Sequence, residues 1–542
     1  MDTILHQTKK IIFNRQKDIL SSTIIISSMI CLSMLFGLLR LRVLATYFTK
    51  EELDIFLSAF RIPDFIYETI VAGALSSAFI PIFVKYDADK KELYDNISSI
   101  INVIFIAMTV FIIFMYFSAD YLLPFITPGF TQGQLHQVIF LSKILLLSQL
   151  PFFVMGGILS AIGQANKIFL ASAIAPVLYN IGIIFGTTVF SMQLGIGGPV
   201  AGVFIGAFLL FLIQVPILFI TKFNYNPFIL KRNIIKEFFY LFSPRMLTVL
   251  TRQIDLTVDL TLSTLLGGGS YTIFYYAQRI QFFPVSFVGM AFGQASLPYL
   301  SELFTQKKIE ELKKIFVDSV LQLLFISVPL SFLLIYARTP LVRIIAGGKK
   351  FDWEATNLTA LTLSFFACSI PFHSLFYFVT RAFYAIHNTK IPFIINVTTT
   401  IINISMSLYL VLIAHYPVWS LAVAFSVAIT IDVLISLVLF YKEIKGYDGK
   451  RLITHALKIY SAAGIASVPA YAVLRIFDLL IINSTRTLSI LMLLALVAVL
   501  YLGLYLLLAW LMDIEELSIL SKLTVALDTM KKRVVEVYTN TE

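Results

Sequence analysis

The sequence predicts an all-α, polytopic membrane protein with about 14 transmembrane helices, arranged as two pseudo-symmetric six-helix lobes plus a two-helix C-terminal extension. Three observations support this fold class: the composition, the recurrence of long apolar segments and an internal repeat. Of the 542 residues, 58% are hydrophobic and only 13% are charged, whereas soluble domains carry about 25% charged residues. The apolar segments recur from end to end, which excludes a soluble protein with a single anchor.

Each expected span holds about 20 or more mainly apolar residues, the length that crosses the hydrocarbon core of a bilayer. The first six are expected near residues 21–46, 55–84, 97–119, 136–163, 168–190 and 197–221. The next six are expected near residues 236–265, 270–302, 315–337, 356–387, 391–414 and 418–441. Two more follow near 454–475 and 487–511. No small-residue cleavage site precedes the first span, so we interpret it as a retained helix.

Basic residues gather in every second connection between these spans. The basic segments are 9–17, 85–91, 222–236, 307–314, 442–451 and 531–533. The positive-inside rule then places both termini in the cytoplasm, with one exception to the pattern around Arg338 and Arg343. The net charge of +10 is therefore explained by membrane topology, and we expect no nucleic-acid partner. Residues 513–542 predict either a cytoplasmic amphipathic helix on the membrane surface or a soluble tail.

Two parts of the sequence repeat each other. The segments "VAGALSSAFIPIF" from Val71 and "VGMAFGQASLPYL" from Val288 share four residues at one constant offset. "AIGQANK" from Ala161 and "AIHNTK" from Ala385 repeat at nearly the same offset. Because each half holds an even number of spans, the repeat is parallel, with substrate expected between rocking lobes. We predict an N-lobe at 1–222, a C-lobe at 223–445 and the extra helices at 446–512.

Arginines inside apolar segments are the strongest functional signal, because a charge at bilayer depth costs roughly 2.5–3.5 kcal/mol. Arg40, Arg61 and Arg279 are each flanked by apolar residues on both sides. The guanidinium fork binds phosphate bidentately, so arginines that face a cavity predict an anion site. For Arg40 and Arg42 the alternative is snorkelling toward the outer interface. For Arg61 the alternative is an ion pair with a nearby aspartate.

A second candidate site contains acidic and amide side chains. Asp259 lies in "DLTVDLTLS", and a carboxylate at this depth is typical of a site for Na⁺ or a proton. The expected span at 391–414 adds oxygen donors at Asn396, Thr400 and Asn403, so we predict a Na⁺ site from these four residues. The alternative is a buried ion pair in which Arg252 holds Asp255 or Asp259. The sequence lacks a Walker A motif, so we expect neither ATP drive nor another cofactor.

Residues 36–86, "FGLLRLRVLATYFTKEELDIFLSAFRIPDFIYETIVAGALSSAFIPIFVKY", closely resemble the first two helices of the MurJ/MviN family of lipid II flippases. The family patterns there are G-x-x-R, D-x-F, F-[KR]-[IL]-P and G-A-x-[ST]-x-A-F-[IV]-P. They correspond to Gly37 and Arg40, Asp54 and Phe56, Phe60 to Pro63, and Gly73 to Pro81. The resemblance continues in order through 127–130, 175–181, 274–301 and 381–392, and so covers roughly the whole chain.

The resemblance implies a function and a fold. The family belongs to an exporter superfamily that includes MATE and polysaccharide transporters, with fourteen helices in two lobes and a lipid-tail groove at helices 13 and 14. Its members move the undecaprenyl-pyrophosphate-linked peptidoglycan precursor, lipid II, to the outer leaflet of the bacterial cytoplasmic membrane. It implies Arg40, Asp54 and Arg279 as substrate-binding residues in the cavity. It also implies Asp259 as the acidic position of a Na⁺ site.

The sequence departs from the family at four polar positions. Met34 and Tyr67 replace arginines, and Ala72 and Gln278 replace acidic residues. We therefore include Arg42 and Arg61 among the substrate-binding residues, as cations that compensate for the missing ones.

Three other functions remain open. One is a MATE-like antiporter of small organic cations, which needs acidic, aromatic-lined cavities and does not suit the arginines of helices 1, 2 and 8. The others are an exporter of another polyprenyl-linked glycan and a scaffold that does not transport. The sequence does not define the oligomeric state. We expect a transporter with no enzymatic activity and lipid II as its substrate.

Overall fold

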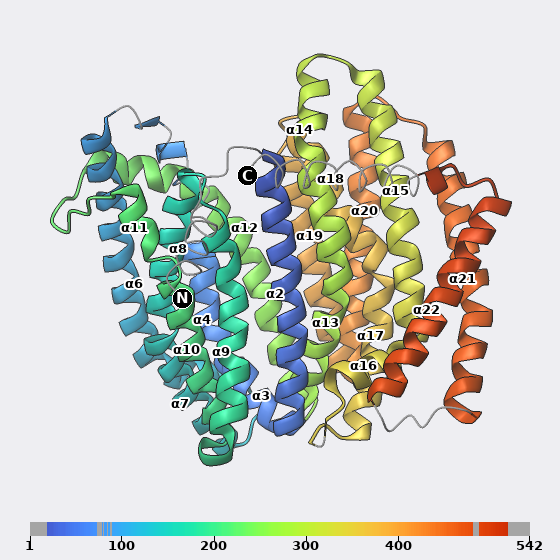
Figure 1. The fold of residues 1–542 in the computed structure, drawn as a ribbon, viewed down its shortest axis with the longest axis horizontal. Coiled ribbons are helices and arrows are strands. Elements are labelled where there is room, and N and C mark those ends of the chain that lie inside the picture. Colours follow the sequence, from blue (N-terminus) through green and yellow to red (C-terminus); the bar gives the residue numbers. More distant parts are fainter. Residues whose placement is uncertain are drawn as a thin grey trace, which may run out of the picture. The chain divides into compact units, whose positions relative to one another are not determined.

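The computed structural model describes residues 19–72, 79, 81–83, 85–86, 89–348, 350–480 and 487–518. Within these residues every regular element is a helix and no strand occurs, which confirms the predicted all-α class (Figure 1). The basic N-terminal segment and most of the tail predicted at 513–542 lie outside the described residues.

The described residues of the first half of the chain form ten α-helices and one π-helix. They are α2 (Ile19–Tyr47), α3 (Lys50–Ala59), α4 (Arg61–Ile66), η1 (Tyr67–Ala72), α6 (Lys90–Ile126), α7 (Gln132–Ser148), α8 (Leu150–Ala165), α9 (Leu170–Leu194), α10 (Gly197–Leu212), α11 (Pro216–Thr221) and α12 (Arg232–Leu265).

The described residues of the second half continue as helices of varied length. They are α13 (Ser270–Val285), η2 (Ser286–Met290), α14 (Ala291–Thr305), α15 (Ile309–Tyr336), α16 (Arg338–Ala346), α17 (Trp353–Cys368), α18 (Ile370–Ala385), α19 (Lys390–Leu408), η3 (Tyr409–Ile413), α20 (Trp419–Glu443), α21 (Gly449–Leu480), α22 (Thr487–Leu511) and η4 (Glu515–Leu517).

Among the described residues, 11 helical segments are long and apolar enough to cross a membrane, or 12 if the bent pair α17 and α18 forms one span. Two predicted spans are absent from this set. The span at 55–84 is broken at Phe60 and continues into residues outside the described part. The span at 236–265 is α12, which is a helix but carries Arg252, Asp255 and Asp259. A multi-pass membrane protein is thus confirmed, and the number fourteen stays a prediction.

The chain divides into two compact units. Unit 1 consists of residues 1–276, 345–359 and 400–421, and unit 2 of 277–344, 360–399 and 422–542. The helix α12 therefore belongs to the same unit as the N-terminal helices. The predicted lobes at 1–222 and 223–445 stay predictions, as does the extension at 446–512.

In unit 1, α9 and α10 pack closely through glycines. Gly182 and Gly186 of α9 face Gly206 and Gly202 of α10, and a Cβ at any of them would overlap with the backbone of the opposite helix. Small residues spaced four apart let two membrane helices approach until their backbones touch. This contact fixes α9, and α9 in turn packs along α2 (Figure 1).

In unit 2, aromatic side chains join α15 to the helices around it. The ring centroids of Phe316 and Phe440 lie 4.3 Å apart, and Phe316 also stacks on Phe378 at 5.5 Å. The hydroxyl of Tyr505 in α22 donates to the carbonyl of Phe325 at 2.9 Å. These contacts, together with the packing of α21 on α15, attach the last two long helices to unit 2.

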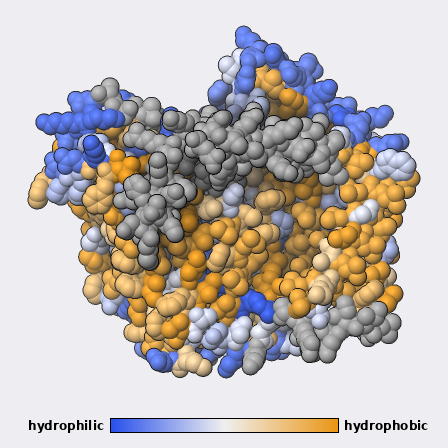
Figure 2. Space-filling view, in the orientation of Figure 1, coloured by the Kyte–Doolittle hydropathy of each residue, from blue (hydrophilic) through white to orange (hydrophobic). Residues whose placement is uncertain are grey.

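Apolar and polar side chains occupy different parts of the surface. Hydrophobic residues cover the length of the membrane helices, and hydrophilic ones gather at helix ends, for example over the connection between α14 and α15 (Figure 2). Exposed apolar residues such as Val110, Val468 and Val499 are those expected of helices that contact lipid.

Candidate functional site

Arg40 lies in α2, within unit 1, and its side chain is half-buried. Its Nε atom is buried, and no described residue accepts a hydrogen bond from it. Arg40 interacts electrostatically with Tyr179 of α9 and Tyr276 of α13. The Tyr276 hydroxyl is itself fixed, because it donates to the carbonyl of Leu41 at 2.9 Å. A buried guanidinium donor without an acceptor is costly, so Arg40 is suited to bind an anion.

There is also open space on the face of α2 that carries Arg40. Gly37 is three residues earlier, on the same face of α2. A Cβ at Gly37 would meet no described atom within 4 Å. Arg42, by contrast, is two residues beyond Arg40 and therefore about 200° around the helix. Arg42 is half-buried, and its predicted role at the same site stays a prediction that this geometry does not favour.

Asp54 of α3 is completely buried, and protein donors surround its carboxylate. Oδ2 accepts from the backbone N–H of Gly269 at 2.6 Å, and Oδ1 accepts from the N–H and the hydroxyl of Thr272, both at 2.7 Å. Because α13 begins at Ser270, Asp54 caps the N-terminus of that helix from outside it, where a negative charge is favourable. These bonds position the start of α13, and the predicted contact of Asp54 with substrate stays a prediction.

The glycines before α13 permit this contact. Gly267 and Gly269 have φ values of +105° and +85°, a backbone region that favours glycine. The sequence "GGGS" at 267–270 thus forms the tight turn between α12 and α13. It presents the Gly269 N–H directly to Asp54.

Arg61, the first residue of α4, is 9% exposed and binds α12. Its Nη2 donates to the carbonyl and to the side-chain oxygen of Gln253, at 2.8 and 2.6 Å, and its Nε donates to the Thr257 hydroxyl at 3.0 Å. These bonds tie α4 to α12. The predicted contact of Arg61 with substrate stays a prediction, and three of its donor bonds go to protein. Sequence reasoning does not single out Gln253, although it lies one turn before Thr257 on the same face of α12.

The acidic residues of α12 meet α19 within unit 1. Asn403 donates from Nδ2 to Oδ1 of Asp255 at 2.9 Å. Asp259 is one turn further along α12 and is 3% exposed. The amide oxygen of Asn403 is buried without a hydrogen-bond partner in the described structure. Two carboxylates and a spare amide oxygen are ligands that suit a hard cation.

The remaining residues of the predicted Na⁺ site divide between the units. Thr400 is half-buried on α19, three residues before Asn403, and Asn396 falls in unit 2. The alternative of a buried ion pair is not supported, since Arg252 is exposed and forms no ion pair with any described residue. Asp259 instead interacts electrostatically with Arg61.

Arg279 lies on α13 in unit 2, where its side chain is exposed. Two residues further on, Gln281 donates to the Ser369 hydroxyl at 3.1 Å and contacts Nδ1 of His373 at 3.2 Å. These bonds fix α13 to α18 within the unit. Joint binding of one substrate by Arg40 and Arg279 stays a prediction.

A chain of many apolar helices that keeps an unsatisfied arginine and buried carboxylates among them has the architecture of a multi-pass membrane transporter. Comparison with known proteins gives the family. The model of the family "Lipid II flippase MurJ" matches residues 44–491. Since this is most of the chain, the protein belongs to the MurJ family of lipid II flippases, as the sequence motifs predict. Members of this family are transporters and not enzymes.

Individual relatives agree with this assignment. The chain is 27% identical over 404 residues to a probable lipid II flippase MurJ of Rickettsia prowazekii, covering 72% of this chain and 78% of the relative. It is 29% identical over 431 residues to the lipid II flippase MurJ of Thermosipho africanus, covering 77% and 84%.

Solved structures show the same fold. A lipid II flippase MurJ in an inward closed conformation matches with a TM-score of 0.75 and 26% identity, covering 89% of this chain and 98% of that one. An inward-facing MATE transporter of the MOP superfamily matches with a TM-score of 0.67 at 13% identity, covering 76% and 94%. The MATE likeness shows the fold alone, so the MATE-like antiporter is the weaker alternative.

Proposed function

We propose that this chain moves lipid II from the inner to the outer leaflet of the bacterial cytoplasmic membrane by alternating access. Membership of the MurJ family supports the cargo. The structural observation that carries the proposal is the buried Nε of Arg40, a charged donor without an acceptor among the described residues. The pyrophosphate of lipid II supplies the acceptor oxygens that such a donor requires.

Arg40 is the primary pyrophosphate ligand in this proposal. Arg279 stays a second candidate ligand, as the family resemblance implies, and Arg42 is a weaker candidate because it extends from a different face of α2. A low dielectric strengthens the contact between guanidinium and phosphate. Neutralising the pyrophosphate also lowers the cost of carrying its charge through the membrane.

Asp54 and Arg61 support the site without touching the cargo. The Asp54 carboxylate holds the start of α13, and Arg61 holds α12. Both residues lie in the first unit with Arg40. They keep the helices around Arg40 in place, which is what a preorganised anion site needs.

The predicted topology suits transport by alternating access. Fourteen spans in two six-helix lobes, with both termini cytoplasmic, satisfy the alternation of basic connections. The helices α21 and α22, which carry exposed apolar residues such as Val468 and Val499, provide a surface for the polyprenyl tail. The membrane potential or a Na⁺ gradient would drive the transport cycle.

The acidic cluster on α12 is the proposed site of that Na⁺. Asp255, Asp259 and the free amide oxygen of Asn403 fit a hard cation, and Thr400 of the same unit is a further candidate ligand. The role of Asn396 stays a prediction from the sequence. When bound, Na⁺ would offset the charge of one of the two carboxylates. The protein residues hold α12 and α19 together through the bond between Asn403 and Asp255.

Sodium is therefore expected to stabilise the purified protein. In 100 mM NaCl the melting temperature should exceed that in 100 mM KCl by about 2 °C or more, because a ligand that binds only the folded state stabilises it. Asp259→Asn should abolish this difference. Asp432→Asn, which changes a buried aspartate of α20 held by Thr399 at 2.8 Å, should retain it. An equal Na⁺ response in wild type and Asp259→Asn would refute the site.

Complementation tests the proposed function. A bacterium depleted of its own lipid II flippase should grow normally when it produces this chain, and should lyse with an empty vector. If the wild-type protein reaches the membrane at normal levels and growth still fails, lipid II is not its cargo. The departures at Met34, Tyr67, Ala72 and Gln278 would then favour another polyprenyl-linked glycan.

A further inference from the structure

Asp432 of α20 is a buried acidic residue of unit 2 that has no role in the proposed lipid II or Na⁺ sites. Its side chain is 2% exposed, and α20 is a candidate membrane span from Trp419 to Glu443. Asp432 lies about three turns before the end of this helix, or about 16 Å along its axis. An acidic residue at such a depth is costly and by default a candidate for function.

The carboxyl group of Asp432 contacts two hydroxyls within unit 2. Oδ2 lies 2.8 Å from Oγ1 of Thr399 on α19, and Oδ1 lies 3.3 Å from Oγ of Ser436 on α20 itself. Both hydroxyl residues are buried. No charged side chain among the described residues forms an ion pair with Asp432. A negative charge on this group would therefore be buried without a cation to balance it.

Titratable groups on the neighbouring helices meet α20 elsewhere or have partners of their own. On α18, the His373 ring contacts Phe425, about two turns before Asp432, with ring centroids 5.4 Å apart. On α15, Asp318 pairs with Arg451 at 2.8 Å. The other charged residues of α19 and α20 lie in the end turns and are exposed: Lys390, Lys442 and Glu443.

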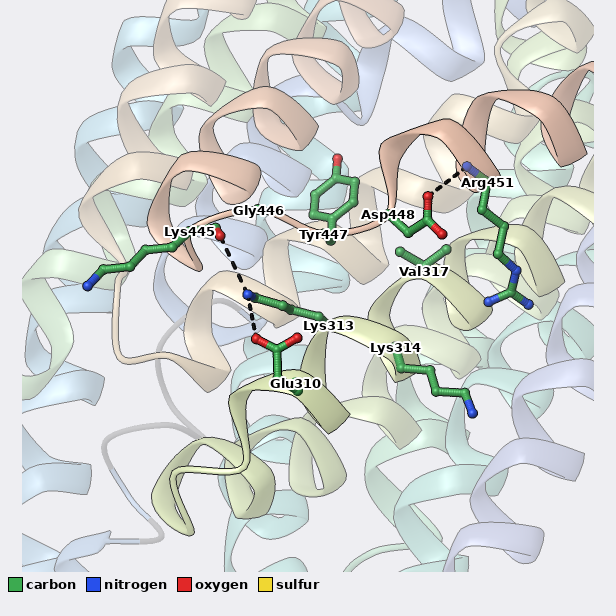
Figure 3. Close-up of a pocket in the computed structure, with 9 residues that line it drawn as sticks. All are labelled: Glu310, Lys313, Lys314, Val317, Lys445, Gly446, Tyr447, Asp448 and Arg451. Carbon is green, nitrogen blue, oxygen red and sulfur yellow. Dashed lines mark hydrogen bonds and ion pairs between the residues drawn. The ribbon is translucent and has the colours of Figure 1, made fainter.

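The carboxylates at the surface of unit 2 differ from Asp432, because they have partners that balance their charge. Figure 3 shows two of them in a pocket between the first turns of α15 and the connection from α20 to α21. There Glu310 contacts Lys313 at 2.8 Å. Asp448 accepts from the backbone N–H of Arg451 at 2.9 Å, at the start of α21, where the helix dipole favours a negative charge.

The contacts of Thr399 define where protons can lie around Asp432. Oγ1 of Thr399 also lies 3.0 Å from the carbonyl oxygen of Ile395 and 3.2 Å from that of Asn396. A hydroxyl has one proton, and a backbone carbonyl only accepts. If Thr399 donates to Ile395, one turn earlier in the helix, its contact with Oδ2 requires a proton on Asp432. With Ser436 donating to Oδ1, every proton of the cluster then has an acceptor and no charge is buried.

The lengths of the contacts agree with a neutral carboxyl group. Hydrogen bonds from a hydroxyl to a carboxylate are about 2.5–2.7 Å long, and those between neutral oxygens are about 2.7–2.8 Å or longer. The two contacts of Asp432, at 2.8 and 3.3 Å, belong to the neutral class. Asp54, by contrast, accepts from the Thr272 hydroxyl at 2.7 Å and from two backbone N–H groups.

We propose that Asp432 is a proton-binding site, at which Oδ2 carries a proton and donates it to Thr399 in this conformation. Because the group is sealed from water, the proton is released only when α19 and α20 separate at Thr399. It then passes from Oδ2 to water and leaves a carboxylate, which the entering water solvates. Proton exchange is thereby linked to a conformational change, as coupled transport requires. This coupling rests on the proposed flippase function, whereas the proton binding does not.

Infrared spectroscopy of the full-length protein, in detergent at neutral pH, tests the proton binding. A protonated carboxyl group has a C=O stretch that a carboxylate lacks, so the difference spectrum of wild type and D432N should contain this band. The matched control is D318N, which changes an ion-paired aspartate of the same unit and should leave the band in place. T399V removes the hydroxyl that accepts the proton, and should keep the band but shift its frequency.

A difference spectrum of wild type and D432N without this band would show that Asp432 is ionised, and would overturn the inference. If D432N does not fold, T399V decides the question, because a spectrum identical to that of wild type would exclude a proton shared with Thr399.

The coupling is tested by the rate at which lipid II becomes exposed on flippase-depleted spheroplasts that produce this chain. An ionophore that exchanges K⁺ for H⁺ should slow wild type severalfold, and D432N should be equally slow with and without it. A wild-type rate that does not respond to the ionophore would overturn the coupling. Lipid II that the wild-type protein never exposes would refute the proposed function itself, while the infrared band still decides whether Asp432 binds a proton.

Discussion

Arg40→Ala is expected to abolish rescue of a flippase-depleted bacterium, although the variant should fold and reach the membrane at wild-type levels. Arg40 carries a buried donor that no described residue satisfies, so its removal breaks no protein hydrogen bond through that atom. It does remove the cation that we propose binds pyrophosphate. Hydrogen bonds to charged groups contribute about 1.5–3 kcal/mol each, and losing a bidentate pair would slow translocation about 100-fold or more.

Two further variants separate this interpretation from the alternatives. Arg40→Lys keeps the charge but loses the fork, and should restore growth only in part. Arg232→Ala removes an exposed arginine at the start of α12 and should leave growth normal. Full growth with Arg40→Ala would contradict the assignment. It would favour the alternative in which the Arg40 side chain extends toward the outer membrane interface.

Asp54→Ala is expected to cause the largest loss of stability among the proposed site residues. The substitution leaves the N–H groups of Gly269 and Thr272 without their acceptor in a fully buried position. Each buried donor left unpaired costs about 1–3 kcal/mol, so the free energy of unfolding should fall by about 3–5 kcal/mol. The measurement is the melting temperature of the purified protein without lipid II, where Asp54→Ala should lie about 3–4 °C below wild type for a chain of this length.

Glu51→Ala is the matched control, because Glu51 is an acidic neighbour on the same helix that is only half-buried. It should leave the melting temperature within about 1 °C of wild type. If Asp54→Ala instead melts like wild type but fails to support growth, Asp54 contacts the cargo, as the family resemblance implies, and is not a positioning residue.

Much of the fold follows from the sequence because membrane helices are specified locally. A run of about 20 apolar residues must form a helix to satisfy its backbone in lipid, so most predicted spans coincide with described helices. Of the two spans missing from the membrane-spanning set, one continues into residues outside the described part, and in the other polar side chains interrupt the apolar pattern. The helix α12 carries Asp255 and Asp259, and the second span breaks at Phe60, before the buried Arg61. The same residues that weaken the membrane signal form the candidate site.

The roles of individual polar residues depend on partners far along the chain, which sequence patterns do not reveal. Arg61 is predicted to be a ligand or a partner of a nearby aspartate, yet its bonds reach Gln253, 192 residues away. The family resemblance implies that Asp54 faces the cavity. In the structure its carboxylate accepts hydrogen bonds from the backbone N–H groups of Gly269 and Thr272. The signal of Arg40 is local, a charge with apolar residues on both sides, and its role in binding substrate stays a prediction.

The central claim is that this chain itself carries lipid II across the membrane, with Arg40 as a ligand of the pyrophosphate. The most direct measurement is the amount of lipid II in the outer leaflet of flippase-depleted spheroplasts, detected with an added enzyme that cleaves only exposed lipid II. Wild-type protein should expose lipid II to cleavage, and Arg40→Ala at equal membrane levels should leave it protected. Lipid II that remains protected when the wild-type protein is abundant in the membrane would contradict the claim.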